Sequence, residues 1–336
     1  MKELDYPFDS EYILKKRRSI KKQLLADGTV NRVIGWKKGE FAYDITPAVF
    51  ESAEEIDKDF VYDDFCGHNL SKYLIKESRK EGKLLAFLKP SDTYSFKQLI
   101  KEHRIIRENV YIIGIQCDGK ADAEKIKAKG ISGITGISSD NDTFTVKTIY
   151  GDEKISKSEV LEERCTVCKS KKHAVYDELI GDEGEVNENS ARFDMVAKLE
   201  NMTADERYAF WRNELSKCIR CNACRNVCPA CSCENCVFDN PNSGVSQKAA
   251  ATSFEENMFH IIRAFHVAGR CTDCGECSRV CPQNIPLHLL NRKFIKDINE
   301  LYGEYQAGVE DEGRTPLTSY TKNDCEPSIV NERGCK

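Results

Sequence analysis

The sequence lacks the features that would place the protein in a membrane, outside the cell or on a nucleic acid. No apolar run approaches the ~20 residues that a membrane-spanning helix needs. The basic run at 15–19 is followed by a segment with charged residues rather than by the apolar core of a signal peptide. The net charge of −5 is opposite in sign to that of a nucleic-acid-binding surface. We therefore expect a cytoplasmic protein that binds neither membrane nor nucleic acid.

Common catalytic signatures are absent as well. The sequence contains no Gly-rich phosphate-binding loop, no H-E-x-x-H zinc motif and no grouping of Ser, His and Asp. Its 6 His residues are dispersed, and we expect His260 and His266 to pack near the cysteine-rich region or tune it rather than to bind metal.

Cysteine, in contrast, is abundant. The chain has 17 Cys among 336 residues, and without an export signal they indicate metal binding rather than disulfide bonds. Two runs fit the pattern C-x2-C-x2-C-x3-C-P, which is typical of ferredoxins with two 4Fe-4S clusters. The first run is Cys218, Cys221, Cys224 and Cys228 before Pro229, and the second is Cys271, Cys274, Cys277 and Cys281 before Pro282.

The pattern also predicts how the thiolates are shared between the clusters. Three Cys spaced by two residues can bind three irons of one cluster, whereas the fourth, before Pro, ligates the other cluster. We therefore assign Cys281 to the cluster of the first run and Cys228 to that of the second. Structural zinc is the alternative, since C-x2-C pairs also form zinc sites. Zinc sites rarely use four Cys this closely spaced with a Pro behind them.

The cysteine runs lie in sequence that predicts helices. Apolar residues recur at helical spacing after the capping box 203–206, over 258–265 and over 287–301. In this setting the segment FHVAGRCTDCGECSRVCP resembles the helical dicluster ferredoxin domains of succinate dehydrogenase iron-sulfur subunits and heterodisulfide reductase C subunits. We therefore predict an all-α dicluster ferredoxin domain at 186–303. We expect the polar residues 304–336 to form an extended tail along a partner subunit.

The N-terminal half predicts a mixed α/β domain at 1–185. Strands alternate with helices there, and a strand, helix and strand over 83–115 indicate parallel sheet, in which ligands gather beyond the carboxyl ends of the strands. A basic amphipathic helix is expected at 9–26. The other expected elements are strands at 32–36, 41–45, 83–88 and 110–115, a helix at 95–106, and a hairpin with strands at 134–138 and 143–149.

Three landmarks of this half carry a resemblance to a known family. They are Lys89-Pro90-Ser91, Gly114-Ile-Gln-Cys117, and Cys165-x2-Cys168 leading to a run at 177–182. In this order they resemble the beta subunits of coenzyme F-420-reducing hydrogenases and formate dehydrogenases, which carry a flavin domain. The resemblance implies a bound FAD. The flavin-binding segment of the family is similar to Ser71-Lys72-Tyr73, so the implied cofactor-binding residues are Asn69, Ser71, Lys72 and Tyr73.

The same resemblance implies a third 4Fe-4S cluster, with Cys117, Cys165 and Cys168 as ligands. The chain departs from the family at Ser91, where the family has the Cys of a Pro-Cys turn. Cys66 is the candidate for the fourth ligand, with Ser91 as a second choice. The alternative is that Cys66 and Cys117 are buried as small apolar residues.

A further C-x-C-x2-C follows the first cysteine run at Cys231, Cys233 and Cys236. Three interpretations are open: another metal site, hydrogen bonds that tune the adjacent cluster, or buried thiols without a role.

These motifs predict an iron-sulfur flavoprotein that transfers electrons as a subunit of a multi-subunit oxidoreductase. A flavin handles two electrons whereas a cluster carries one at a time. The terminal catalysis, on a partner chain, would be that of a hydrogenase, a formate dehydrogenase or a heterodisulfide-reductase-like subunit. The carrier at the flavin would be a ferredoxin, a nicotinamide or a deazaflavin. The alternative is a flavin-free 4Fe-4S relay and docking subunit with no reaction of its own.

Overall fold

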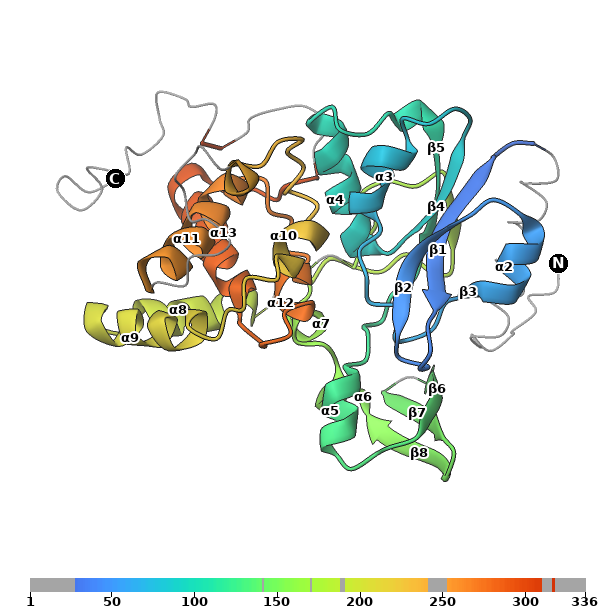
Figure 1. Cartoon of the computed structure of the whole chain (residues 1–336), viewed down its shortest axis with the longest axis horizontal. Coiled ribbons are helices and arrows are strands. Elements are labelled where there is room, and N and C mark those ends of the chain that lie inside the picture. Colours follow the sequence, from blue (N-terminus) through green and yellow to red (C-terminus); the bar gives the residue numbers. More distant parts are fainter. Residues whose placement is uncertain are drawn as a thin grey trace. The chain divides into compact units, whose positions relative to one another are not determined.

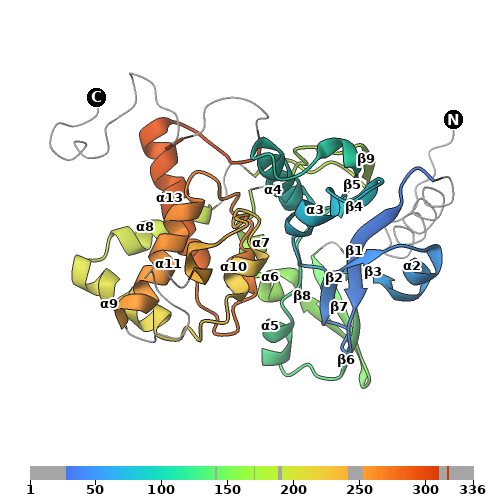
Figure 2. The same ribbon diagram turned by 45° about the horizontal axis from the view of Figure 1, so that its top comes forward.

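The computed structural model describes residues 28–140, 142–169, 171–187, 191–240, 253–309 and 316–317. These residues form two compact units (Figures 1 and 2). Unit 1 comprises the described residues of Met1–Thr93 and Ile105–Asn187, and unit 2 comprises those of Tyr94–Arg104 and Glu188–Lys336. The expected helix at 9–26 and most of the expected tail at 304–336 lie outside the described residues, and the three-domain division stays a prediction.

Unit 1 is built on a six-stranded sheet with the order β2-β1-β4-β5-β9, in which β3 also pairs with β1. Strands β1, β4, β5 and β9 run parallel, and β2 and β3 are antiparallel to β1. All five residues of β4 are buried, as expected of a central parallel strand. The strands are β1 Arg32–Lys38, β2 Ile45–Phe50, β3 Phe60–Val61, β4 Leu84–Leu88, β5 Val110–Ile115 and β9 Glu178–Ile180.

A smaller antiparallel sheet, β6-β7-β8, completes the strands of unit 1 and is separate from the larger sheet in Figure 1. The expected hairpin is confirmed, and a third strand extends it. The strands are β6 Ile134–Asp140, β7 Thr143–Thr148 and β8 Gly151–Ser156. The helices of unit 1 are α2 Ala53–Asp59, α3 Ser71–Glu77, η1 Arg107–Asn109, α5 Ala123–Ala128, α6 Lys157–Val160 and α7 Glu163–Thr166.

Two of the expected elements are wrong in their bounds. The strand expected at 41–45 begins only at Ile45, because the Asp44 N–H bonds to the Phe41 carbonyl and closes a turn. The helix expected at 95–106 is α4, Pro90–Lys101. It begins early because Pro suits a first helical turn, and it ends early because His103 has a φ of 54°, outside the helical range.

Unit 2 consists of helices joined by loops, so the expected mixed α/β region followed by an all-α region is confirmed. The Thr203 and Glu206 side chains form the expected capping box at the start of α9. The far part of α4 belongs to this unit, where the Ser95 and Thr272 hydroxyls are 2.8 Å apart. The other helices are η2 Ala191–Phe193, α8 Asp194–Glu200, α9 Ala204–Leu215, α10 Ala223–Val227, η3 Val237–Asp239, α11 Ser253–Val267, α12 Glu276–Arg279 and α13 Leu287–Tyr302.

Among the described residues, no helix combines the length and the apolar character that crossing a membrane would require.

Candidate functional site

The two cysteine runs of unit 2 have the same backbone conformation. Arg220 and Asn222 have left-handed φ values of 54° and 63°, and Asp273 and Gly275, at the corresponding positions, have 59° and 69°. The second residue of each pair precedes a short helix, α10 or α12. Successive backbone N–H groups in such left-handed turns make a concave site for anions. Each loop is therefore shaped to donate hydrogen bonds to sulfur.

Backbone donors do reach the thiols of both loops. The Arg220 N–H donates to Cys218 Sγ at 3.4 Å, and the Asp273 N–H makes the corresponding bond to Cys271. The Glu276 N–H likewise bonds to Cys274. A hydrogen bond to the charged form of a group favours that form, so these contacts favour thiolates.

The thiols gather in two groups of four, and each group takes three Cys from one run and one from the other. Burial, with Cys281 among the neighbouring thiols, raises the pKa of Cys218 and of Cys224. In the second run, burial is again the main cause of the raised thiol pKa values, and Cys228 is the first-run neighbour that all three thiols share, while Cys277 also lies near Cys224. The first thiol group is Cys218, Cys221, Cys224 and Cys281, and the second thiol group is Cys228, Cys271, Cys274 and Cys277.

The first thiol group lines a cavity whose wall also includes Phe259 and His260. Four thiols around one cavity, with backbone donors aimed at sulfur, are a donor set that suits a 4Fe-4S cluster. Within the described parts of the chain, no three His, Cys, Asp or Glu side chains form a group that could hold a metal ion. The assignment of 4Fe-4S clusters to the two thiol groups therefore rests on which thiols lie together and on the conformation of the two loops.

Two buried residues of α11 lie at the thiol groups, and sequence reasoning found only one of them. Burial, together with Arg263 and Arg220, lowers the pKa of His260 to about 3, so the ring is neutral. Arg263 is buried and donates from Nη2 to the Cys224 carbonyl oxygen at 3.0 Å. No clear signal in the sequence pointed to Arg263, because it lies on a different face of the helix from the apolar residues Met258, Ile261, Ile262 and Phe265.

Cys228 differs from the other thiols of the second thiol group. Hydrogen bonds from the Cys231 thiol, and from the Ala230 and Cys231 N–H groups, lower the pKa of Cys228 to about 5 although burial opposes this. Of the three interpretations of the extra cysteines, tuning therefore suits Cys231. The buried-thiol interpretation is wrong for Cys233, which is exposed.

The three cysteines expected at a third cluster lie together in unit 1. Cys117 follows β5, and Cys165 lies in α7. Burial raises the pKa of Cys165 to about 12, and Cys117 and Cys168 are among the neighbours that add to the effect. The structure thus brings together residues that are far apart in the sequence.

Cys66, the candidate for the fourth ligand, contacts Asp63. Its Sγ accepts from the Asp63 N–H at 3.2 Å and lies 3.6 Å from Asp63 Oδ1. Burial, followed by the Asp63 carboxylate, raises the pKa of Cys66 well above its usual value. Lys120, which is buried, has the thiols of both Cys66 and Cys117 among its neighbours. As the fourth ligand, Cys66 stays a prediction, and the contacts of its thiol point elsewhere.

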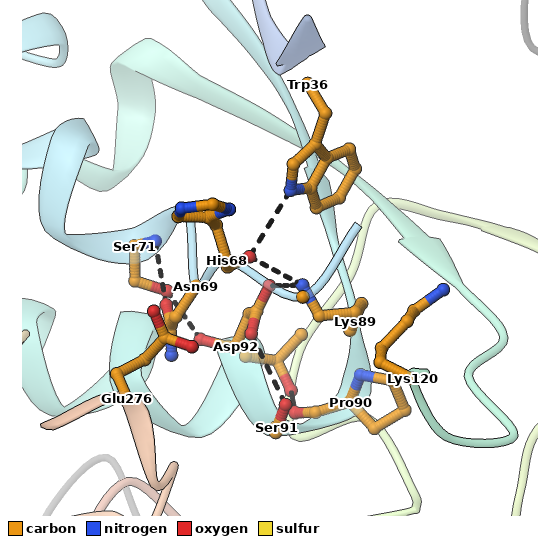
Figure 3. A network of polar contacts seen from close by, with 12 residues as sticks. Trp36, His68, Asn69, Ser71, Lys89, Pro90, Ser91, Asp92, Lys120 and Glu276 are labelled. Atoms are coloured by element: carbon orange, nitrogen blue, oxygen red, sulfur yellow. Dashed lines mark hydrogen bonds and ion pairs between the residues drawn. The ribbon is translucent and has the colours of Figure 1, made fainter. Parts of the chain in front are cut away.

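A buried ion pair, unexpected from the sequence, follows β4 at its carboxyl end (Figure 3). Lys89 Nζ is 2.9 Å from Asp92 Oδ2, and the two side chains are 2% and 1% exposed. Lys89 Nζ also donates to the His68 carbonyl at 2.7 Å and lies 4.7 Å from the centre of the Trp36 ring. The pair fixes the first turn of α4 to the loop before α3.

The residues expected at the flavin fall into two kinds. Asn69 and Ser71 are fully buried, and their side chains are hydrogen-bonded within the protein. Asn69 Oδ1 accepts from the Ser71 N–H at 2.9 Å, and Ser71 Oγ donates to the Asp92 carbonyl at 2.6 Å. Tyr73, in contrast, is 38% exposed and Lys72 is half-buried. Asn69 and Ser71 are therefore suited to shape the loop, and Lys72 and Tyr73 to contact a ligand.

Comparison with known proteins gives results for both units. A family model described as a 4Fe-4S dicluster domain matches residues 214–285. The F420-dependent formate dehydrogenase subunit beta of Methanocaldococcus jannaschii is 23% identical over 86% of this chain and 90% of its own. The F420-dependent formate dehydrogenase 1 subunit beta of Methanococcus maripaludis is 26% identical over 88% and 91%.

Among solved structures, a chain of the F420-reducing NiFe hydrogenase complex from Methanosarcina barkeri is 15% identical with a TM-score of 0.38, over 57% of this chain and 77% of that chain. The curated relatives agree with the resemblance that the ordered cysteine motifs carry. This chain is therefore similar over most of its length to the beta subunits of F420-dependent formate dehydrogenases, and its residues 214–285 match a 4Fe-4S dicluster domain, a module of electron transfer.

Proposed function

We propose that this chain is the iron-sulfur flavoprotein subunit of a cytoplasmic multi-subunit oxidoreductase and conducts electrons between a flavin and a catalytic partner. The observation that carries the proposal is the crossed grouping of the cysteine thiols in unit 2, within the segment that matches a dicluster domain. When bound, 4Fe-4S clusters take up and release single electrons. The relatives favour a formate dehydrogenase as the partner and a deazaflavin as the carrier.

The chain's own residues would bind and tune these groups. The first and second thiol groups would each hold one cluster, and the loop N–H groups would stabilise the thiolate charge. Cys117, Cys165 and Cys168 would hold a third cluster, with Lys120 as a buried positive charge beside Cys117. A bound FAD would supply the exchange of electron pairs with a diffusing carrier.

The number of clusters can be tested by iron and acid-labile sulfide analysis. We expect about 12 iron atoms per chain from three clusters. Cys165→Ala should lower this to about 8, because it removes a ligand of the third cluster only. Cys233→Ala is the matched control, since Cys233 is exposed and lies outside every proposed ligand set. Equal iron in Cys165→Ala and unaltered protein would refute the third cluster, and a colourless unaltered protein would refute the whole proposal.

The flavin can be tested by extracting the anaerobically purified protein. We expect about one FAD per chain. Tyr73→Ala should lower the FAD content several-fold without changing the iron content, because the exposed ring would pack against the bound flavin. Tyr150→Ala removes another exposed tyrosine, on the turn between β7 and β8, and should change neither. Full iron content with no flavin in the unaltered protein would favour the flavin-free relay.

A further inference from the structure

One face of α11 runs past both thiol groups. Phe259 packs with Cys224 and Cys277, and about two turns later Val267 packs with Cys228. Residues four apart lie on the same face of a helix, so Arg263, four residues from both Phe259 and Val267, lies on this face between them. The helix therefore carries a positive side chain to the place where the two thiol groups approach each other.

The contacts of Arg263 agree with this position. Its side chain is 3% exposed, and within the described residues its Nε has no hydrogen-bond acceptor. Although burial opposes the charge, neighbouring thiols that include Cys228, Cys277 and Cys224 raise the pKa of Arg263 above its usual value. These thiols come from both groups. A buried N–H donor next to cysteine thiols is well placed to meet an acceptor atom of a bound cluster.

His260 lies one turn before Arg263 and offers a contrast. It lines the cavity of the first thiol group, and within the described residues neither ring nitrogen has a hydrogen-bond partner. Its ring is neutral. The two residues therefore differ in charge although they lie one turn apart on the same helix.

We propose that the positive charge of Arg263 raises the reduction potentials of both clusters. The inference rests on the proposed function, namely that the two thiol groups hold 4Fe-4S clusters. Reduction adds one negative charge to a cluster, and a nearby positive charge in a buried, low-dielectric site stabilises the reduced form. Because Arg263 lies between the groups, it raises the reduction potentials of both clusters. It therefore changes the average of the two potentials more than the difference between them.

The test is an anaerobic redox titration of the full chain in which electron paramagnetic resonance measures the amount of each reduced cluster. For Arg263→Gln we expect the ratio of reduced to oxidised cluster, at the midpoint of the unaltered protein, to fall about tenfold for both clusters, equivalent to about 59 mV for one electron. Arg263→Lys keeps the charge and should lower the ratio by less than threefold. His260→Phe should affect the first cluster alone. Lys198→Gln removes an exposed positive charge from α8 and should change neither cluster.

Each outcome decides the proposal. A shift of one cluster only in Arg263→Gln, no shift, or an equal shift in Arg263→Lys would overturn it. Arg263→Met is the second neutral variant, and loss of iron from both neutral variants would show a purely structural role and overturn the proposal as well. The iron content distinguishes failure of the proposed function from failure of the role of Arg263. Unaltered protein without iron refutes the proposed function, whereas variants with full iron content and unchanged reduction potentials refute only the role of Arg263.

Discussion

Replacing Cys281 with Ala is expected to destroy the cluster of the first cysteine run and to leave that of the second run intact. The reason is that the Cys281 thiol lies near Cys218 and Cys224 of the first run. We expect the iron content to fall by about 4 atoms per chain, or by about 1 if a three-iron cluster remains. Electron paramagnetic resonance of the reduced protein would show which signal is lost.

Matched variants make this result decisive. Cys281→Ala and Cys218→Ala should leave the same residual spectrum, and Cys228→Ala should match Cys271→Ala. If Cys281→Ala instead matched Cys277→Ala, each run would bind its own cluster and the crossed assignment would be wrong. Cys233→Ala again serves as the control that keeps both signals.

Replacing Asp92 with Ala should lower the free energy of unfolding by about 3–5 kcal/mol, because it leaves the buried Lys89 charge without its carboxylate. Urea denaturation measures the change. The double variant Lys89→Met/Asp92→Leu should recover most of the loss, since apolar residues of similar volume often replace a buried pair at little cost.

An exposed ion pair provides the control for this prediction. Lys37 Nζ is 2.6 Å from Asp59 Oδ2, and the Lys37 side chain is 47% exposed, so Asp59→Ala should change stability little. A change in Asp92→Ala as small as that in Asp59→Ala would contradict the structural role of the Lys89 and Asp92 pair.

The parts of the site that could be predicted from the sequence depend on short-range spacing. Cys218, Cys221 and Cys224 are close together because two residues separate each pair, and a ferredoxin pattern already states which thiol crosses over. The helices of unit 2 follow from apolar periodicity over a single segment. Neither inference needs to know how distant parts of the chain meet.

The parts that could not be predicted depend on burial and on contacts between distant segments. Lys89 and Asp92 look like solvated charges in the sequence, and only the sheet and the loop at His68 make them a buried pair. The fourth ligand of the third cluster cannot be read from spacing for the same reason; Cys66 stays a prediction, and the fold places its thiol against Asp63. The early start of α4 was a missed local signal, since Pro90 suits a first helical turn.

The crossed grouping of the thiols also bears on how the protein is made. A nascent chain that has left the ribosome as far as Cys228 offers three of the four thiols of the first thiol group and one of the second. The second thiol group is complete only once Cys277 has been synthesised, and the first only once Cys281 has been. Under the proposed assignment, a polypeptide that ends between the two runs would therefore lack a complete ligand set for either cluster, rather than for one.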